Sequence, residues 1–279
     1  MRKDDCTMNC TVIGKSVQGA SHIVHNTECQ DSYRQVQFDD GCAIVAVADG
    51  HGSSSCPFSK SGSTIAVNTF IHIISELHDL YADKLDALST YLNREGEVKI
   101  AQTIDLEWKK RVLKAHSNAK RDFPLDEGGN RNKEAVYKMY GSTLLGAFIT
   151  PEFVFAFQLG DGDIMFVNDT YCEPVIEGDK ILGVETHSLS KNQAWKTTIT
   201  TIRRIDDNMF PCLFMLSTDG LSNSYINDVE FKKTCTDYYN LIKEYGATRI
   251  SKQLKDWLSD TSREGCGDDI TAVFAYLTQ

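Results

Sequence analysis

The apolar run Cys42-Ala43-Ile44-Val45-Ala46-Val47-Ala48 leads directly into the polar sequence Asp49-Gly50-His51-Gly52. A short apolar run that ends at an acidic residue or a glycine is typical of a buried β-strand followed by a turn. Similar runs recur at residues 143–149, 153–158, 164–167, 211–217 and 270–276. Several of them are bordered by an acidic residue, so the sequence predicts a sheet-based fold with carboxylates at the ends of its strands.

The spacing between these runs indicates how the sheet is built. Runs 143–149 and 153–158 are separated only by Thr150-Pro151-Glu152, which suits a hairpin and therefore an antiparallel pair. Apolar residues at helical spacing predict helices around residues 66–77, 108–119 and 250–258. Polar stretches at 93–96, 122–133 and 185–208 are expected to be loops. No linker divides the chain, so we expect one α+β domain over residues 1–279.

Composition excludes several classes of partner. The chain has 279 residues, and 29 basic against 39 acidic side chains give it a net charge of −10, which argues against a nucleic-acid partner. No apolar run approaches the roughly 20 residues needed to cross a bilayer, and Met1–Cys6 is charged where a secretory signal would be apolar. Nine scattered cysteines without a Cys-x-x-Cys pair favour free thiols. We expect a cytoplasmic globular protein with no membrane partner.

The candidate chemistry lies in five acidic residues beside predicted strands, namely Asp31, Asp49, Asp161, Asp219 and Asp268. One Asp-Gly is more often a turn than a ligand, but five acids in strand-terminal positions favour a shared site. Carboxylates that converge repel one another and raise one another's pKa unless a cation lies between them. Oxygen ligands without a matching His/Cys cluster favour Mg²⁺ or Mn²⁺ over zinc.

In this order, the motifs resemble those of the metal-dependent type 2C serine/threonine protein phosphatases, from about Gly19 to Tyr276. The pieces that carry the resemblance are Val47-Ala48-Asp49-Gly50-His51-Gly52, Tyr140-Gly141-Ser142-Thr143, Leu159-Gly160-Asp161, Ser217-Thr218-Asp219-Gly220 and Asp268-Asp269-Ile270-Thr271-Ala272-Val273. The resemblance implies a four-layer α-β-β-α sandwich, in which two antiparallel sheets pack face to face with helices outside.

The resemblance also implies the metal ligands. Asp49 would bridge two Mn²⁺ or Mg²⁺ ions, the Gly50 carbonyl would bind one of them, and Asp219 with Asp268 would complete the other. Asp269, which adjoins Asp268, remains an alternative ligand at the last motif.

Two further acids are implied at the edge of this site. Asp31 would act through a water molecule, and Asp161 would serve a third, weaker metal ion.

By the same resemblance, a water bridging the metals would attack phosphoserine or phosphothreonine in a protein that an opposing kinase has phosphorylated. His51 resembles the family's general acid, which would protonate the leaving alkoxide. The arginine that most members carry before Asp31 is replaced by Asn26, and His22 resembles a bacterial branch with a histidine at the phosphate. His22 is therefore the candidate substrate-binding residue.

Two departures from the family pattern leave other functions open. Gln30 stands where most members have an acid, and Asn223 occupies a position where many have a third-site aspartate, so metal affinity is expected to be lower. One alternative is a weakly active or inactive domain that binds phosphoproteins in a regulatory role. Another is a phosphatase that acts on a small phosphorylated metabolite.

Overall fold

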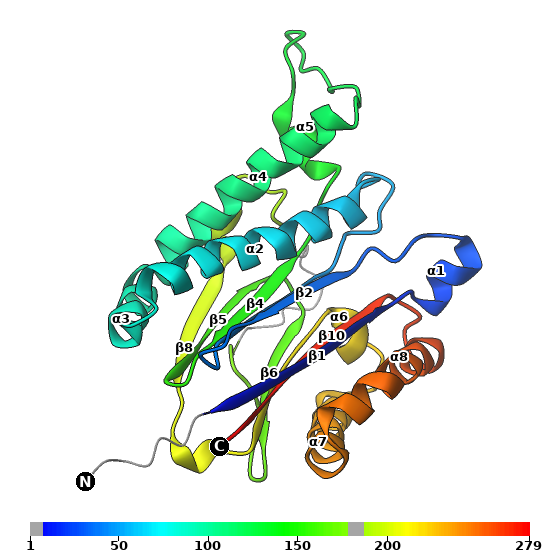
Figure 1. Ribbon diagram of the computed structural model, residues 1–279. Coiled ribbons are helices and arrows are strands. Elements are labelled where there is room, and N and C mark those ends of the chain that lie inside the picture. The colour runs from blue at the N-terminus through cyan, green and yellow to red at the C-terminus, as the bar shows by residue number, and fades with distance from the viewer. Residues whose placement is uncertain (1–7, 178–186) are drawn as a thin grey trace.

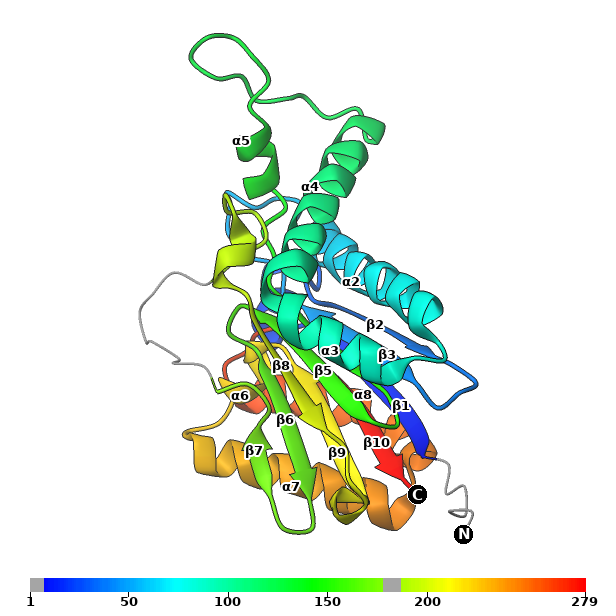
Figure 2. The same cartoon turned by 90° about the vertical axis from the view of Figure 1, so that its left-hand side faces the viewer.

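The central strands of the fold are buried on both faces, which explains their continuous apolar sequences. Along β3 (Ala43–Ala48), Val45 and Val47 pack into the core between the two sheets, whereas Ile44 and Ala46 pack against helices on the other side. The computed structural model describes residues 8–177 and 187–279. These residues form two five-stranded antiparallel sheets, packed face to face between layers of helices (Figures 1 and 2).

The two sheets are called here sheet A and sheet B. Sheet A consists, in spatial order, of β1 (Asn9–Val17), β10 (Ile270–Thr278), β9 (Cys212–Ser217), β6 (Asp163–Asn168) and β7 (Cys172–Pro174). Sheet B consists, in spatial order, of β2 (Ser32–Gln37), β3, β4 (Leu144–Ile149), β5 (Phe153–Leu159) and β8 (Ile199–Arg204).

Helices cover the outer face of each sheet. The layer on sheet B consists of α2 (Ser59–Tyr81), α3 (Leu85–Glu95), the π-helical turn η1 (Gly96–Ile100) and α4 (Ala101–Asn118). The layer on sheet A consists of α7 (Asp228–Tyr245) and α8 (Ala247–Glu264). Phe70 of α2, Trp108 of α4 and Leu254 of α8 are fully buried beneath these layers.

Short helices lie in the connections. They are α1 (Ala20–His25), α5 (Lys133–Lys138), η2 (Ala194–Thr197), η3 (Asp207–Met209) and α6 (Asp219–Ser222). The far end of α4 and α5 project beyond the sheets at the top of Figure 1. None of the helices in the described residues is both long and apolar enough to span a membrane.

The predicted sandwich and the predicted hairpin are confirmed. β4 and β5 pair antiparallel across residues 150–152, and the helices predicted around 66–77, 108–119 and 250–258 lie in α2, α4 and α8. The expectation about Met1–Cys6 lies outside the described residues.

Two predicted loops were wrong in part. Residues 93–95 belong to the end of α3, and Gly96 begins η1. The glycine is required there by packing and not by a loop, because an added Cβ would lie 3.0 Å from the Phe155 ring. The polar stretch 185–208 contains β8, whose residues are mostly half-buried because it is the edge strand of sheet B. Residues 185 and 186 of that stretch lie outside the described residues.

Candidate active site

Antiparallel pairing brings the predicted acidic residues to one edge of the sandwich. Ser32 of β2 pairs with Ala48 of β3, so Asp31 and Asp49 lie at the same end of sheet B. In sheet A, Ser217 of β9 pairs with Asp163 of β6 and with Ala272 of β10. The segments that carry Asp161, Asp219 and Asp268 therefore meet at one end of that sheet.

Asp31 is buried at the point where the sheets face each other. Its Oδ2 accepts a hydrogen bond of 2.7 Å from the Thr218 hydroxyl, which links the two sheets. Its Oδ1 is buried and accepts no hydrogen bond from any described residue, although the carboxylate lies within hydrogen-bonding range of Asp49. Burial, together with the charge of Asp269, raises the pKa of Asp31 to about 7, although the hydrogen bond from Thr218 acts in the opposite direction. Such surroundings favour a proton or a cation close to the two carboxylates over two bare negative charges.

The main chain of Asp49 is held by hydrogen bonds, and its side chain lies among other acids that disfavour its negative charge. Its amide donates to the Thr143 hydroxyl at 2.9 Å, and the Thr143 amide donates to the Asp49 carbonyl at 2.9 Å. Burial, followed by the charges of Asp31, Asp219 and Asp268, raises the pKa of Asp49 well above its usual range. The side chain lies where its neighbours disfavour a bare negative charge.

Gly50 permits the close approach of three chain segments beside Asp49. An added Cβ would lie 2.7 Å from the carbonyl oxygen of Gln30 and 2.8 Å from that of Ser59. Any larger residue would separate β3 from α2 and displace Asp31, so the Asp-Gly sequence here is required by packing.

Asp219 begins α6 and belongs to the same cluster. Burial, followed by the charges of Asp161 and Asp268, raises its pKa to about 6, and Asp163 contributes to the same effect. Asn223 donates from Nδ2 to Asp219 Oδ2 at 2.9 Å. The neutral amide of Asn223 therefore lies beside Asp219. In the family pattern that this sequence resembles, many members have an aspartate at that position.

The adjacent acids Asp268 and Asp269 have different surroundings. Asp269 is 3% exposed; its Oδ1 accepts hydrogen bonds from the Gly19 amide at 2.7 Å and from His22 Nδ1 at 2.9 Å, and its Oδ2 accepts one from the Gln30 amide at 2.6 Å. The Asp268 side chain is 52% exposed, and its charge acts on both Asp49 and Asp219. Asp269 therefore holds the loops in place, whereas the half-exposed Asp268 carboxylate accepts a hydrogen bond of 2.8 Å from the adjacent Asp269 amide.

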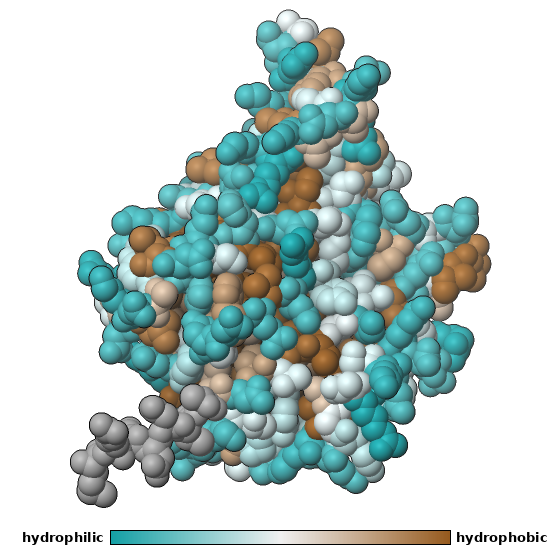
Figure 3. All heavy atoms as spheres, viewed as in Figure 1, coloured by the Kyte–Doolittle hydropathy of each residue, from teal (hydrophilic) through white to brown (hydrophobic). Residues whose placement is uncertain are grey.

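His22 lies at the rim of the acidic cluster. Its Nδ1 bonds to Asp269, and its Nε2 is 3.8 Å from Asp268 Oδ1. The predicted substrate-binding histidine is thus beside the acids, but one ring nitrogen is already occupied. On the outer side of α1, Ile23 and Val24 are 62% and 80% exposed, and they form the hydrophobic surface at the right edge of Figure 3.

His51 follows Asp49 by two residues and also lines a cleft on the surface of the described residues. Its amide donates to the Gly141 carbonyl at 3.1 Å, and its ring lies over Gly141, where an added Cβ would be 2.7 Å from His51 Cδ2. The cleft has a volume of about 930 Å³ and is also lined by Lys109 of α4, Tyr137 of α5 and Trp195 of η2. None of the five candidate acids lines this cleft, so His51 is the one predicted site residue that it contains.

The comparisons with known proteins agree with this geometry. A family model described as protein phosphatase 2C matches residues 18–259. This chain belongs to the protein phosphatase 2C family. No curated protein sequence matches it.

Solved structures of bacterial phosphatases have a similar fold. A structure described as a bacterial serine phosphatase superposes with a TM-score of 0.64 at 14% identity, covering 96% of this chain and 98% of that one. The catalytic domain of the serine/threonine phosphatase PstP, in complex with two manganese ions, gives 0.60 at 14% identity, with 98% and 100% covered. Stp1 from Staphylococcus aureus gives 0.58 at 15% identity, with 96% and 95% covered.

Three residues that contact or surround the acids of this protein phosphatase 2C domain were not predicted from the sequence. Thr218 fixes Asp31, and Asp163 adds a buried charge beside Asp219. Lys60, in the first turn of α2, donates from Nζ to the Asp31 carbonyl at 2.6 Å. Thr218 lies inside the quoted motif at residues 217–220 and Asp163 lies two residues after the motif that ends at Asp161, whereas nothing in the sequence connects Lys60 with Asp31.

The raised carboxylate pKa values predict how metal-free stability depends on pH. Asp31 and Asp219 have pKa values of about 7 and about 6 in the fold, against about 3.9 in the unfolded chain. Protons held only by the folded state stabilise it fully below about pH 4, and this contribution is lost as the pH rises through about 7. We expect the Tm of EDTA-treated protein to fall by several degrees between pH 5 and pH 8, and Mn²⁺ to restore it at pH 8. Asp31→Asn should make the Tm of the metal-free protein depend less on pH. An unchanged slope of Tm against pH in this variant would contradict the role of Asp31.

The contacts of Asp268 and Asp269 predict that replacing each with asparagine has a different effect, one on metal binding and the other on stability. Asp269→Asn should lower the free energy of unfolding by about 2–4 kcal/mol, because the buried carboxylate accepts three hydrogen bonds. Asp268→Asn should leave the metal-free protein as stable as before, and should weaken Mn²⁺ binding at least about 10-fold. Denaturant unfolding and calorimetric Mn²⁺ titration of both variants measure the two effects. The reverse pattern would make Asp269 the ligand.

Proposed function

We propose that this chain is a metal-dependent protein phosphatase that hydrolyses phosphoserine and phosphothreonine in proteins. The observation that carries the proposal is the buried Asp31 Oδ1, which accepts no hydrogen bond from the described residues and lies in a cluster of acids whose pKa values are raised by one another. An all-oxygen donor set of this kind fits a hard divalent cation. Membership of the protein phosphatase 2C family supports the reaction class.

The acids would hold two Mn²⁺ or Mg²⁺ ions. Asp49 would bridge them, with the Gly50 carbonyl on one and Asp219 and Asp268 on the other, and Asp31 would act through water. The two manganese ions reported for PstP support this number and kind of metal. When bound, such ions would lower the pKa of water and screen the phosphoryl oxygens.

A third, weaker ion would be held by Asp161 beside Asp219. The pKa of Asp219 is raised by the charge of Asp161, which supports a cation between them. Asn223 occupies one oxygen of Asp219 with a neutral amide, so this ion should bind less tightly than the other two.

Two histidines would handle the substrate. His51, which lines the cleft, would give a proton to the leaving serine or threonine oxygen, which is a poor leaving group as an alkoxide. His22 would contact the phosphate from the other side, oriented by its bond to Asp269. An imidazole binds phosphate less firmly than the bidentate guanidinium of an arginine.

The surroundings of the site favour a protein as substrate over a small metabolite. A cleft of about 930 Å³ is much larger than a phosphate monoester needs, and Ile23 and Val24 expose apolar surface next to His22. A phosphoprotein substrate requires an opposing serine/threonine kinase. If the chain dephosphorylates small metabolites faster than phosphopeptides, this assignment is wrong.

A second candidate function is a regulatory phosphoprotein-binding domain with little or no activity. It is favoured by Asn223, which donates to Asp219 in place of a carboxylate, and by Gln30, whose buried Oε1 accepts no hydrogen bond from the described residues. Both residues reduce the negative charge near the metals and so weaken metal binding.

Activity against a phosphopeptide separates the two functions. With Mn²⁺, the wild-type chain should release phosphate, and EDTA should abolish the release. Asp49→Asn should lower the rate at least about 100-fold, because Asp49 is the proposed bridging ligand. The variant should fold with an equal or higher metal-free Tm, since a repelled buried charge is removed. Phosphopeptide binding without turnover in the wild type would instead establish the regulatory function.

The proton donor can be tested by changing the leaving group. His51→Gln should lower phosphopeptide turnover by about 10²-fold or more, within the range of general acid catalysis. Turnover of p-nitrophenyl phosphate should fall much less, because nitrophenolate leaves without a proton. Lys138→Gln, an exposed residue that lines the same cleft, is the matched control for a change in the cleft alone. Equal losses on both substrates with weaker Mn²⁺ binding would make His51 a structural neighbour of Asp49.

A further inference from the structure

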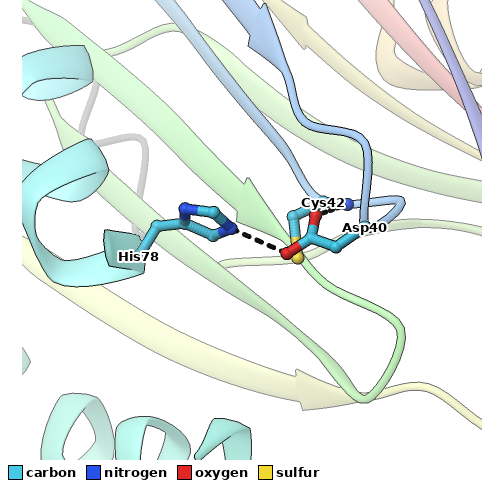
Figure 4. A group of neighbouring side chains, drawn as sticks. All are labelled: Asp40, Cys42 and His78. Carbon is cyan, nitrogen blue, oxygen red and sulfur yellow. Dashed lines mark hydrogen bonds and ion pairs between the residues drawn. The ribbon is translucent and has the colours of Figure 1, made fainter. Parts of the chain in front are cut away.

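A second group of potential metal ligands lies at the opposite end of β3 from Asp49. Asp40 and Cys42 belong to the turn between β2 and β3, and His78 belongs to the last turns of α2 (Figure 4). One ligand atom from each residue can be chosen so that all three lie within 4.8 Å of one another. Six residues of β3 separate this turn from Asp49, a distance of about 20 Å along a strand.

The turn fixes the Asp40 carboxylate. Its Oδ1 accepts a hydrogen bond of 2.9 Å from the Cys42 amide, which leaves Oδ2 directed at His78 Nε2, 2.8 Å away. Gly41 adopts a φ of +84°, a conformation that other residues rarely adopt, and so allows this turn. Cys42 is 1% exposed, so its thiol is held in the same small space.

His78 is oriented as metal-binding histidines commonly are. Its ring stacks on Phe38, with a centroid distance of 3.9 Å, and is almost fully buried. Its Nδ1 is 3.3 Å from Asp79 Oδ1, so a carboxylate can accept the proton of that nitrogen. Once an ion displaces the proton between Nε2 and Asp40, a carboxylate at Nδ1 favours the tautomer in which Nε2 carries a lone pair for the metal.

We propose that Asp40, Cys42 and His78 bind one zinc ion at a site separate from the acidic cluster. An oxygen, a sulfur and a nitrogen ligand suit zinc, with water in the fourth position, and do not suit Mg²⁺ or Mn²⁺. Zinc would replace the proton between His78 and Asp40, and the Cys42 thiol would lose its proton. Ligand bonds of 2.0–2.2 Å in a tetrahedron require Nε2 and Oδ2 to separate to about 3.3 Å, a shift of roughly half an ångström.

An ion can reach this site from solvent. Asp40 is 44% exposed, and Asp40 and Cys42 line a surface cleft of about 770 Å³ that is also lined by Phe38. Bound zinc would join the β2–β3 turn to the end of α2. Because Lys60 and Ser63 in the first turns of α2 hold the Gln30–Asp31 segment, the ion would fasten the far end of the helix that supports the acidic cluster.

Cobalt(II) distinguishes this site from the acidic one, because only a cysteine ligand gives a thiolate-to-cobalt charge-transfer band. Full-length protein is stripped with chelator, saturated with Mn²⁺ and titrated with Co²⁺. We expect the band to saturate at one equivalent and to disappear when Zn²⁺ is added. Cys42→Ser should abolish it, and His78→Gln should weaken Co²⁺ binding at least about 100-fold. Asp79→Asn should weaken it about 10-fold or more.

Controls separate the site from other thiols and from misfolding. Cys266→Ser is the matched control, because Cys266 is an exposed thiol beside Gly220 in the acidic cluster, and it should leave the band unchanged. Asp40→Asn keeps an acceptor for the Cys42 amide and therefore the turn, so its weaker Co²⁺ binding would report ligand loss without unfolding. Phosphatase activity with Mn²⁺ should be unchanged in His78→Gln. The proposal is overturned if wild-type protein gives no band, or if the band persists in Cys42→Ser.

Discussion

Mutual repulsion among buried carboxylates is the constraint on which the arrangement of this protein depends. Asp31, Asp49 and Asp219 have pKa values raised by burial and by other acids, so the fold holds them together at a cost. The opposing contribution comes from apolar cores on both sides of each sheet, which fix the strand ends that carry them. A divalent cation removes the repulsion, which is why the same packing that is unfavourable for the bare protein is suited to metal-assisted hydrolysis.

Not every acid at this edge has the same role, and hydrogen bonds separate the roles. Asp269 accepts bonds from Gly19, His22 and Gln30, and so joins the start of β10 to the segment before β2. Thr218 joins Asp31 to the segment after β9. These contacts leave the buried Asp31 Oδ1 without a hydrogen bond from any described residue, whereas Asp219 and Asp268 each accept one from a neighbouring amide.

The sequence predicted the features that depend on local pattern. Strands such as β3 and β9 are continuous apolar runs, and the Asp-Gly positions follow them, so the sandwich and the candidate acids could be named. Features that depend on distant contacts were missed or left open. β8 is a half-buried edge strand with a polar sequence, and Gly96 serves packing against Phe155 where a glycine suggested a loop. Asp269 is distinguished from Asp268 by its hydrogen bonds to residues that are distant in the sequence. The contact between Asp40 and His78 likewise joins residues that are distant in the sequence.

Helix α2 connects two ligand sets of different chemistry. Its first turns fasten the segment that carries Asp31, where all candidate ligands are oxygens, and its last turns carry His78, where a nitrogen and a sulfur replace two of them. Lys60 and His78 are about 27 Å apart along the helix, so an ion at one end does not act on the other by charge through water and salt. It acts by rigidity, because a helix held at both ends, with Phe70 and Ile74 buried between, moves as one body. Selectivity between the two ends follows from donor type: hard ions favour the carboxylates, and a borderline ion favours the mixed site.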